Sequence, residues 1–242
     1  MPLRLARATC LVLALLTGAA AKADDLTDFN DAVEAAAAHN RVAIGYLRTG
    51  NADLASLEVD RLRAAWSKLV EHFSGHRPSA FNSNALYGTT LVGISARLVG
   101  ADLMLKTGRL DSAREGLEAV RGDLYALRQS AGIKVLADCI LDSNRAAAAF
   151  MAYDTAEVDW SKPEIARAIA EKAAAYTDVL NRCDGLASET LRKDPEFRRL
   201  IDEAKNELAK VSQTVETRDT SRLHRIVGSL RAIDNLLAFR FG

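Results

Sequence analysis

The 242-residue sequence has little proline and few cysteines, and its apolar residues rarely alternate with polar ones. Four prolines leave room for long uninterrupted helices, because proline breaks a helix interior. The missing alternation removes the pattern of half-buried β-strands. Three cysteines without a C-x-x-C pair exclude a structural zinc site. What the chain does have is apolar residues recurring at intervals of three and four, which indicates amphipathic helices.

Motifs of catalysis and of nucleotide binding are also missing. The sequence contains no G-x-S-x-G, no H-E-x-x-H and no phosphate-binding glycine loop. Inward E-x-x-H pairs of di-iron bundles are absent as well. Acidic residues are spread along helix exteriors beside basic ones, a pattern typical of solvated ion pairs. We therefore predict that the chain is not an enzyme, that it has no catalytic residue and that it holds no cofactor.

The first 23 residues carry the pattern of a secretory signal peptide. Arg4 and Arg7 precede an apolar run over residues 8–16, and the A-K-A ending stops at Ala23. A basic start, a short apolar centre and an A-x-A ending are the parts of such a signal. The run is shorter than the roughly 20 apolar residues that span a bilayer. We expect a signal peptide over residues 1–23 and a mature chain in the periplasm.

The charge balance argues against two classes of partner. The whole chain has 32 basic and 32 acidic side chains. Removal of the predicted signal takes away three basic residues and no acidic one, which leaves a net charge of −3. A nucleic-acid-binding protein would show a strongly basic face instead. We expect no nucleic acid as a partner and no stable membrane span.

Helical periodicity divides the chain into about eight helices. They are expected over residues 26–48, 51–73, 85–106, 110–129, 134–153, 161–183, 194–211 and 219–241. Helices of about 20 residues with short connections favour antiparallel neighbours, as in up-and-down bundles. The predicted fold is therefore all-α, with two antiparallel up-and-down bundles. We place the N-terminal bundle at residues 24–132 and the C-terminal four-helix bundle at 133–242.

One short stretch is duplicated within the first bundle. L-R-T-G-N-A-D-L-A at residues 47–55 returns 58 residues later as L-K-T-G-R-L-D-S-A at 105–113. Its glycine suits the left-handed conformation that closes a helix. Polar side chains after the glycine can accept hydrogen bonds from the free N–H groups of the next helix. The candidate acceptors are Asn51 or Asp53 in the first copy and Asp111 in the second.

The duplicated bend resembles the turn of a tetratricopeptide repeat, where alanine follows glycine by five residues. Gly50 with Ala55 and Gly108 with Ala113 both fit this spacing. That family, however, repeats every 34 residues. The 58-residue interval instead favours a duplicated long helical hairpin.

Histidines and cysteines give two candidate sites. His72 and His76 have the i, i+4 spacing that can place two ligands on one metal ion, although Gly75 lies between them. Cys139 and Cys183 would both remain in a mature exported chain, where the compartment permits a disulfide. Each also lies on an apolar helical stripe, where a buried free thiol is common. The sequence leaves the disulfide and the two free thiols open.

Four aromatic residues flank the polar loop after the second predicted helix. They are Trp66, Phe73, Phe81 and Tyr87. At the end of a bundle such side chains can line a ligand pocket between facing helices. The competing interpretation is that they fill the end of the core.

Residues 195–241 resemble the last two helices of cytochrome c prime, a periplasmic four-helix bundle. Phe239-Arg240 matches the Phe-Arg pair near the end of that family. The positions of its two haem-attachment cysteines and its haem-ligating histidine are held by Ala232, Asn235 and Leu236. Covalent haem attachment is therefore excluded.

Together these features predict a non-catalytic periplasmic helical-bundle protein. Its partner is expected to be another periplasmic protein or a small ligand, and a second copy in a homodimer is included. The alternative is a bundle related to cytochrome c prime that binds haem non-covalently or a metal ion.

Overall fold

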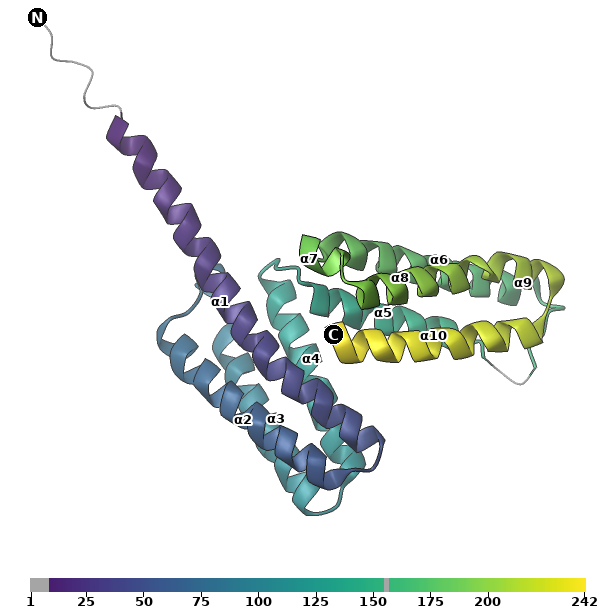
Figure 1. The fold of residues 1–242 in the computed structure, drawn as a ribbon, viewed down its shortest axis with the longest axis horizontal. Helices are drawn as coiled ribbons and strands as arrows, with labels where there is room; N and C mark the ends of the chain where they lie inside the picture. Colours follow the sequence, from purple (N-terminus) through teal and green to yellow (C-terminus); the bar gives the residue numbers. More distant parts are fainter. Residues whose placement is uncertain (1–8, 155–156) are drawn as a thin grey trace, which may run out of the picture. The chain divides into compact units, whose positions relative to one another are not determined.

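The computed structural model describes residues 9–154 and 157–242, with side chains described from Asp25 onward. The described residues form helices and no β-strand, so the predicted all-α class is confirmed (Figure 1). The helices are α1 (Thr9–Arg48), α2 (Ala52–Gly75), η1 (Ser79–Phe81, a 3₁₀ turn), α3 (Leu86–Lys106), α4 (Leu110–Ser130), α5 (Leu136–Met151), α6 (Pro163–Leu186), α7 (Glu189–Arg192), α8 (Pro195–Ala209), α9 (Val211–Thr217) and α10 (Thr220–Phe241). The predicted signal peptide lies partly outside the described residues, and the backbone of α1 begins within it.

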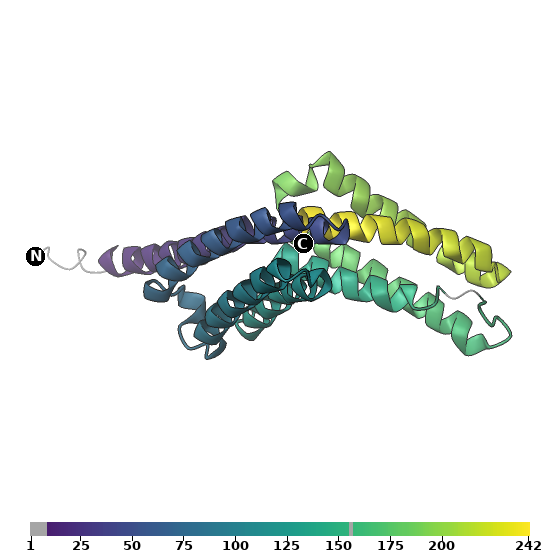
Figure 2. The same ribbon diagram turned by 90° about the horizontal axis from the view of Figure 1, so that it is seen from below.

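The chain divides into two compact units, Met1–Ile133 (unit 1) and Lys134–Gly242 (unit 2). In unit 1, α1 packs against α2 and α4, and α3 packs against the same two helices. Short turns make these neighbours antiparallel (Figures 1 and 2). In unit 2, α5 and α8 each pack against both α6 and α10. Both units are antiparallel helical bundles, as the sequence predicted.

Each helix of unit 1 buries a regular 4-3 repeat of positions. We call the buried set the inner seam; it comprises Phe29, Val33, Ala36, Asn40, Ala43 and Leu47 on α1, Ala55, Val59, Leu62, Trp66, Leu69 and Phe73 on α2, Tyr87, Leu91, Ile94, Leu98, Ala101 and Leu105 on α3, and Ala113, Leu117, Val120, Leu124 and Leu127 on α4. Such a repeat keeps one stripe of a helix against its neighbours, as in coiled coils. The seam differs from the predicted stripe at Leu54 and Leu57, which are 39% and 46% exposed.

The duplicated bend has the predicted backbone in both copies. Gly50 and Gly108 have φ angles of 74° and 72°, the left-handed region that costs a Cβ-bearing residue energy. Asn51 caps α2 by accepting a hydrogen bond from the Leu54 amide at 3.2 Å. The second copy differs, because Arg109 occupies the cap position of α4 without a side-chain bond. Asp111 lies instead in the first turn, where its charge favours the helix N-terminus.

The helix ends of unit 2 follow the sequence only in part. Asp194 and Asp219 cap α8 and α10, each accepting an amide hydrogen bond at 2.8 Å. The predicted Ser161 cap of α6 is wrong, because Lys162 holds that position and the Ser161 hydroxyl bonds to Asp159. The single helix predicted after Asp194 is also interrupted, since α8 ends at Ala209 and α9 begins at Val211.

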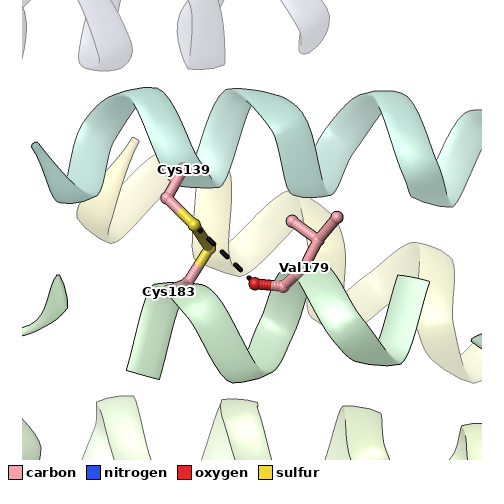
Figure 3. The surroundings of a disulfide bond; sticks show 3 residues. All are labelled: Cys139, Val179 and Cys183. Carbon is pink, nitrogen blue, oxygen red and sulfur yellow. Dashed lines mark hydrogen bonds between the residues drawn. A yellow bond between two sulfur atoms is a disulfide. The ribbon is translucent and has the colours of Figure 1, made fainter. Parts of the chain in front are cut away.

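A disulfide joins α5 to α6 inside unit 2. Cys139 and Cys183 are 6% and 0% exposed, and their Cα atoms lie 5.4 Å apart. Figure 3 shows both side chains pointing toward each other between the two helices. The Cys139 sulfur also lies 3.7 Å from the Val179 carbonyl oxygen, a packing contact because a bonded sulfur has no hydrogen to donate. The bond closes a loop across 44 positions of sequence.

Candidate binding surface

The four aromatic residues predicted to line a pocket fill the end of the unit 1 core instead. Trp66, Phe73, Phe81 and Tyr87 are between 0% and 5% exposed. Phe29 packs at their centre, with ring centroids 5.2 Å from Phe73 and 5.4 Å from Phe81. These edge-on contacts are the geometry of a packed aromatic cluster. The pocket interpretation of these residues is therefore corrected in favour of core packing.

Tyr87 has its polar atom satisfied within this cluster. Its hydroxyl donates to the Phe73 carbonyl at 3.0 Å. Burial raises the pKa of the Tyr87 phenol to about 12, against a smaller opposing effect of the Arg77 charge. Arg77 lies over the ring, 4.8 Å from its centroid. A phenol that stays protonated and bonded to a backbone carbonyl supports the core and has no role as a base.

His72 and His76 lie close together near the exposed end of α2. Their rings stack with centroids 5.0 Å apart and an interplanar angle of 15°. The His76 Nδ1 lies 3.2 Å from the His72 carbonyl oxygen, within hydrogen-bond distance. Among the residues that the structure describes, no group of three or more His, Cys, Asp or Glu side chains gathers to hold a metal ion. The pair alone thus offers at most two ligands.

The positions aligned with haem attachment lie on the surface of unit 2. Ala232, Asn235 and Leu236 are all exposed, and Leu236 is 40% exposed. The neighbouring positions Ile233 and Leu237 face the core, at 7% and 0% exposure. The interior beside these positions is filled by packed side chains of the bundle.

Two polar clusters in unit 2 are held by internal bonds. Asp184, at the end of α6, accepts from Arg198 at 2.8 Å and from Lys205 at 3.3 Å. Burial alone would raise the pKa of Asp184, but the hydrogen bonds and charges of these two partners lower it below its usual value. Asp234 accepts from Asn144 at 2.9 Å and lies 3.5 Å from the Tyr176 hydroxyl. Both clusters tie helices together.

The outward face of α3 is the surface that this internal accounting leaves over. Its apolar side chains point to solvent: Val92 is 68% exposed, Val99 56% and Leu103 53%. Thr89 and Ala96 are exposed on the same face. We call these five residues, at intervals of three, four, three and four, the outer seam. They follow the same repeat as the inner seam but have no neighbour within unit 1.

The two seams of α3 lie on opposite sides of one helix. Each outer-seam residue precedes an inner-seam residue by two positions, as Val92 precedes Ile94. Two residues turn a helix by about 200° at 3.6 residues per turn. The inner seam of α3 is 0–7% exposed and fills the core of unit 1. The helix therefore carries two packing faces, of which the bundle uses one.

The other three helices of unit 1 place acidic side chains at the corresponding outward positions. These are Asp31 and Glu34 on α1, Asp53, Asp60 and Glu71 on α2, and Asp111, Glu115 and Glu118 on α4. Charged groups there keep water against the helix at no cost of burial. The apolar character of the α3 face is thus particular to that helix and does not follow from the bundle architecture.

A groove flanks the outer seam on each side. Between α2 and α3 it has a volume of about 430 Å³, with Ala64, Ser67, Val70 and Val99 among its walls. Between α3 and α4 it has a volume of about 500 Å³, and Leu86, Thr89, Gly93 and Ala96 contribute. The α3 ridge and these grooves have the shape that receives a further helix, since helices pack ridges into grooves.

By length and composition alone, α3 is also the described helix that could cross a membrane. The class defined by this fold and surface is an all-α protein of two antiparallel bundles with one apolar helix face uncovered. Comparison with protein families, curated proteins and solved structures found no match to this chain.

Proposed function

We propose that the chain is a non-catalytic, exported binding protein, and that it binds a protein partner through the outer face of α3. The observation that carries the proposal is the outer seam, an apolar repeat more than half exposed at Val92, Val99 and Leu103. Covering such side chains removes apolar surface from water, worth about 25 cal/mol per Å². Contiguous apolar surface of this kind is characteristic of interaction sites.

The shape of the surface favours a protein over a small ligand. Small-ligand sites are concave and enclose most of the molecule they hold. The outer seam is a ridge between two open grooves, and the aromatic residues expected to enclose a ligand are core. A ridge of this form gains most from an extended partner that runs along it.

The 4-3 spacing further favours a helical partner. An apolar repeat of this kind is the pattern by which one helix recognises another. The seam runs over 15 residues, about 21 Å along the helix axis at ~1.5 Å per residue. A partner helix of four turns would cover it from Thr89 to Leu103.

Site-specific photocross-linking in the periplasm of an expressing bacterium tests this function. A photoreactive amino acid at Val92 should give a cross-linked adduct of defined mass upon illumination. The same group at Glu115, an exposed outward position of α4, is the matched control and should give none. Absence of any protein adduct at Val92, or equal adducts at both positions, would count against the function. Finding the chain unprocessed in the cytoplasm would count against export.

A further inference from the structure

We infer that the partner of the outer seam is the outer seam of a second copy of this chain, so that two α3 helices pack together in a symmetric homodimer. This inference rests on the proposed function and names its partner. It commits the exposed face of α3 to one occupant. The reasons are the shape of the ridge, the charge around it and the extent of the surface.

The composition of the ridge suits a helix identical to itself. Along the seam, Val92, Val99 and Leu103 are separated by the small residues Ala96 and, beside them, Gly93 and Gly100. A Cβ atom added at either glycine would meet nothing within 4 Å, so the helix has open space there. A branched side chain of one copy can therefore enter the space over a small residue of the other. Small residues also let two helix backbones approach closely.

The charges around the ridge cancel, which a symmetric contact requires. In a twofold interface the same patch lies on both sides, so a patch with net charge would repel its own copy. The α2–α3 groove carries Asp60 and Arg63, 3.7 Å apart. The α3–α4 groove carries Arg97 and Asp123, which form an ion pair. Each groove thus holds one charge of each sign, and the seam between them holds none.

The surface is large enough for a stable dimer. A standard interface buries about 800 Å² per partner and involves roughly 20 residues on each side. The outer seam and the walls of the two grooves together present about that number. In a twofold arrangement the ridge of each copy enters a groove of the other, so both grooves contribute.

A lipid surface is the main competing occupant, and the composition of α3 is against it. Helices that rest on membranes place Lys, Arg, Trp or Tyr at the border of the apolar face. The aromatic residue of α3, Tyr87, is 2% exposed and belongs to the core. Its basic side chains are engaged, Arg97 with Asp123 and Lys106 with Asp102 at 2.8 Å.

Molar mass measured by sedimentation equilibrium over a range of concentrations tests the homodimer on residues 24–242. The wild-type chain should be a dimer that dissociates on dilution. Replacing Val92 and Val99 by glutamate would place four carboxylates in a symmetric apolar contact, and each buried charge is costly. The Kd of the dimer should then rise on the order of 100-fold or more. Circular dichroism should be unchanged, because both side chains are more than half exposed in the folded chain.

Leu57→Glu is the matched control, since it charges an exposed leucine of α2 outside the outer seam. It should leave the dimer intact. A monomer at all concentrations would overturn the inference, and so would a dimer that persists in the Val92→Glu, Val99→Glu variant. Binding of the monomer to anionic lipid vesicles through the seam would assign the face to a membrane instead. A monomer that still gives a Val92 photoadduct with a different protein would reject self-pairing while leaving the proposed function standing.

Discussion

Replacing Cys139 and Cys183 together by alanine measures what the disulfide contributes to unit 2. Both cysteines are buried, so alanine removes the covalent link without burying a new polar atom. The bond connects α5 to α6 across 44 positions of sequence. Without it, the unfolded chain regains the conformational freedom of that loop, and the folded state loses stability by comparison.

The size of the effect follows from the loop length. The chain-entropy relation gives a loss of about 13 cal/mol/K for closing a loop of this size, or about 4 kcal/mol at 25 °C. That value is a large part of the 5–15 kcal/mol typical of a domain. We therefore expect the double alanine variant to unfold at clearly lower denaturant concentration than the wild-type chain.

Urea unfolding followed by tryptophan fluorescence provides the assay. A Trp66→Phe background leaves Trp160, which packs against the unit 2 core and donates to the Thr220 hydroxyl at 2.7 Å, as the reporter of unit 2. Added reductant should destabilise the parent and leave the double alanine variant unchanged. A loss below about 1 kcal/mol, or an equal response of both proteins to reductant, would refute the reasoning that this loop is closed by a bond.

Three further substitutions probe other parts of the fold. Asp184→Asn should cost about 1 kcal/mol at pH 7; because the folded pKa of Asp184 is lowered, the wild-type advantage should be constant above pH 5 and disappear as pH falls below about 4, and an advantage that grows on acidification would contradict this. Gly108→Ala, at φ 72°, should cost about 1–2 kcal/mol in thermal unfolding, whereas Gly122→Ala, inside α4 with open space around it, should stabilise by about 0.5–1 kcal/mol; equal effects would remove the backbone argument. Asp219→Ala should lower stability by about 1 kcal/mol through loss of the α10 cap, and Asp219→Asn should restore most of it, since asparagine also accepts the Arg222 amide bond.

Regular features of the fold could be predicted because they depend on local spacing. Left-handed glycines closed α1 and α3, and Asp194 and Asp219 capped their helices, since these roles follow from neighbouring residues alone. The edge of a stripe is harder to predict. Leu54 and Leu57 are as apolar as the residues that α2 buries, and only the position of α1 and α3 decides that Ala55 and Val59 face inward.

The uncovered face of α3 escaped prediction for a related reason. The helix is apolar on both sides, so its sequence does not say which 4-3 repeat enters the core and which faces water. Attention fell on Trp66, Phe73, Phe81 and Tyr87 because large rings dominate both pockets and cores, and composition does not separate the two. A signal was available in the two apolar repeats of α3, offset by two residues, since each of the other helices of unit 1 has acidic residues on the side opposite its core.

Longer-range features required the folded chain itself. Cys139 and Cys183 occupy apolar stripes that suit a thiol as well as a disulfide, and their partnership depends on the alignment of α5 with α6. Ser161 has the chemistry of a helix cap, but it bonds to Asp159 in the preceding turn. The Asp184 cluster draws on residues from α6 and α8 and therefore has no signature in any single helix.

Cysteine cross-linking along the outer seam tests the central claim most directly. Single cysteines at Thr89, Val92, Ala96, Val99 and Leu103, in the presence of the native disulfide, report which positions meet their own counterparts in a second chain. Pairing through the seam predicts a covalent dimer from at least one of the five under mild oxidation, and none from a cysteine at Glu115. Cross-linking at Glu115 with none along the seam would contradict the claim that two copies of this chain meet at α3.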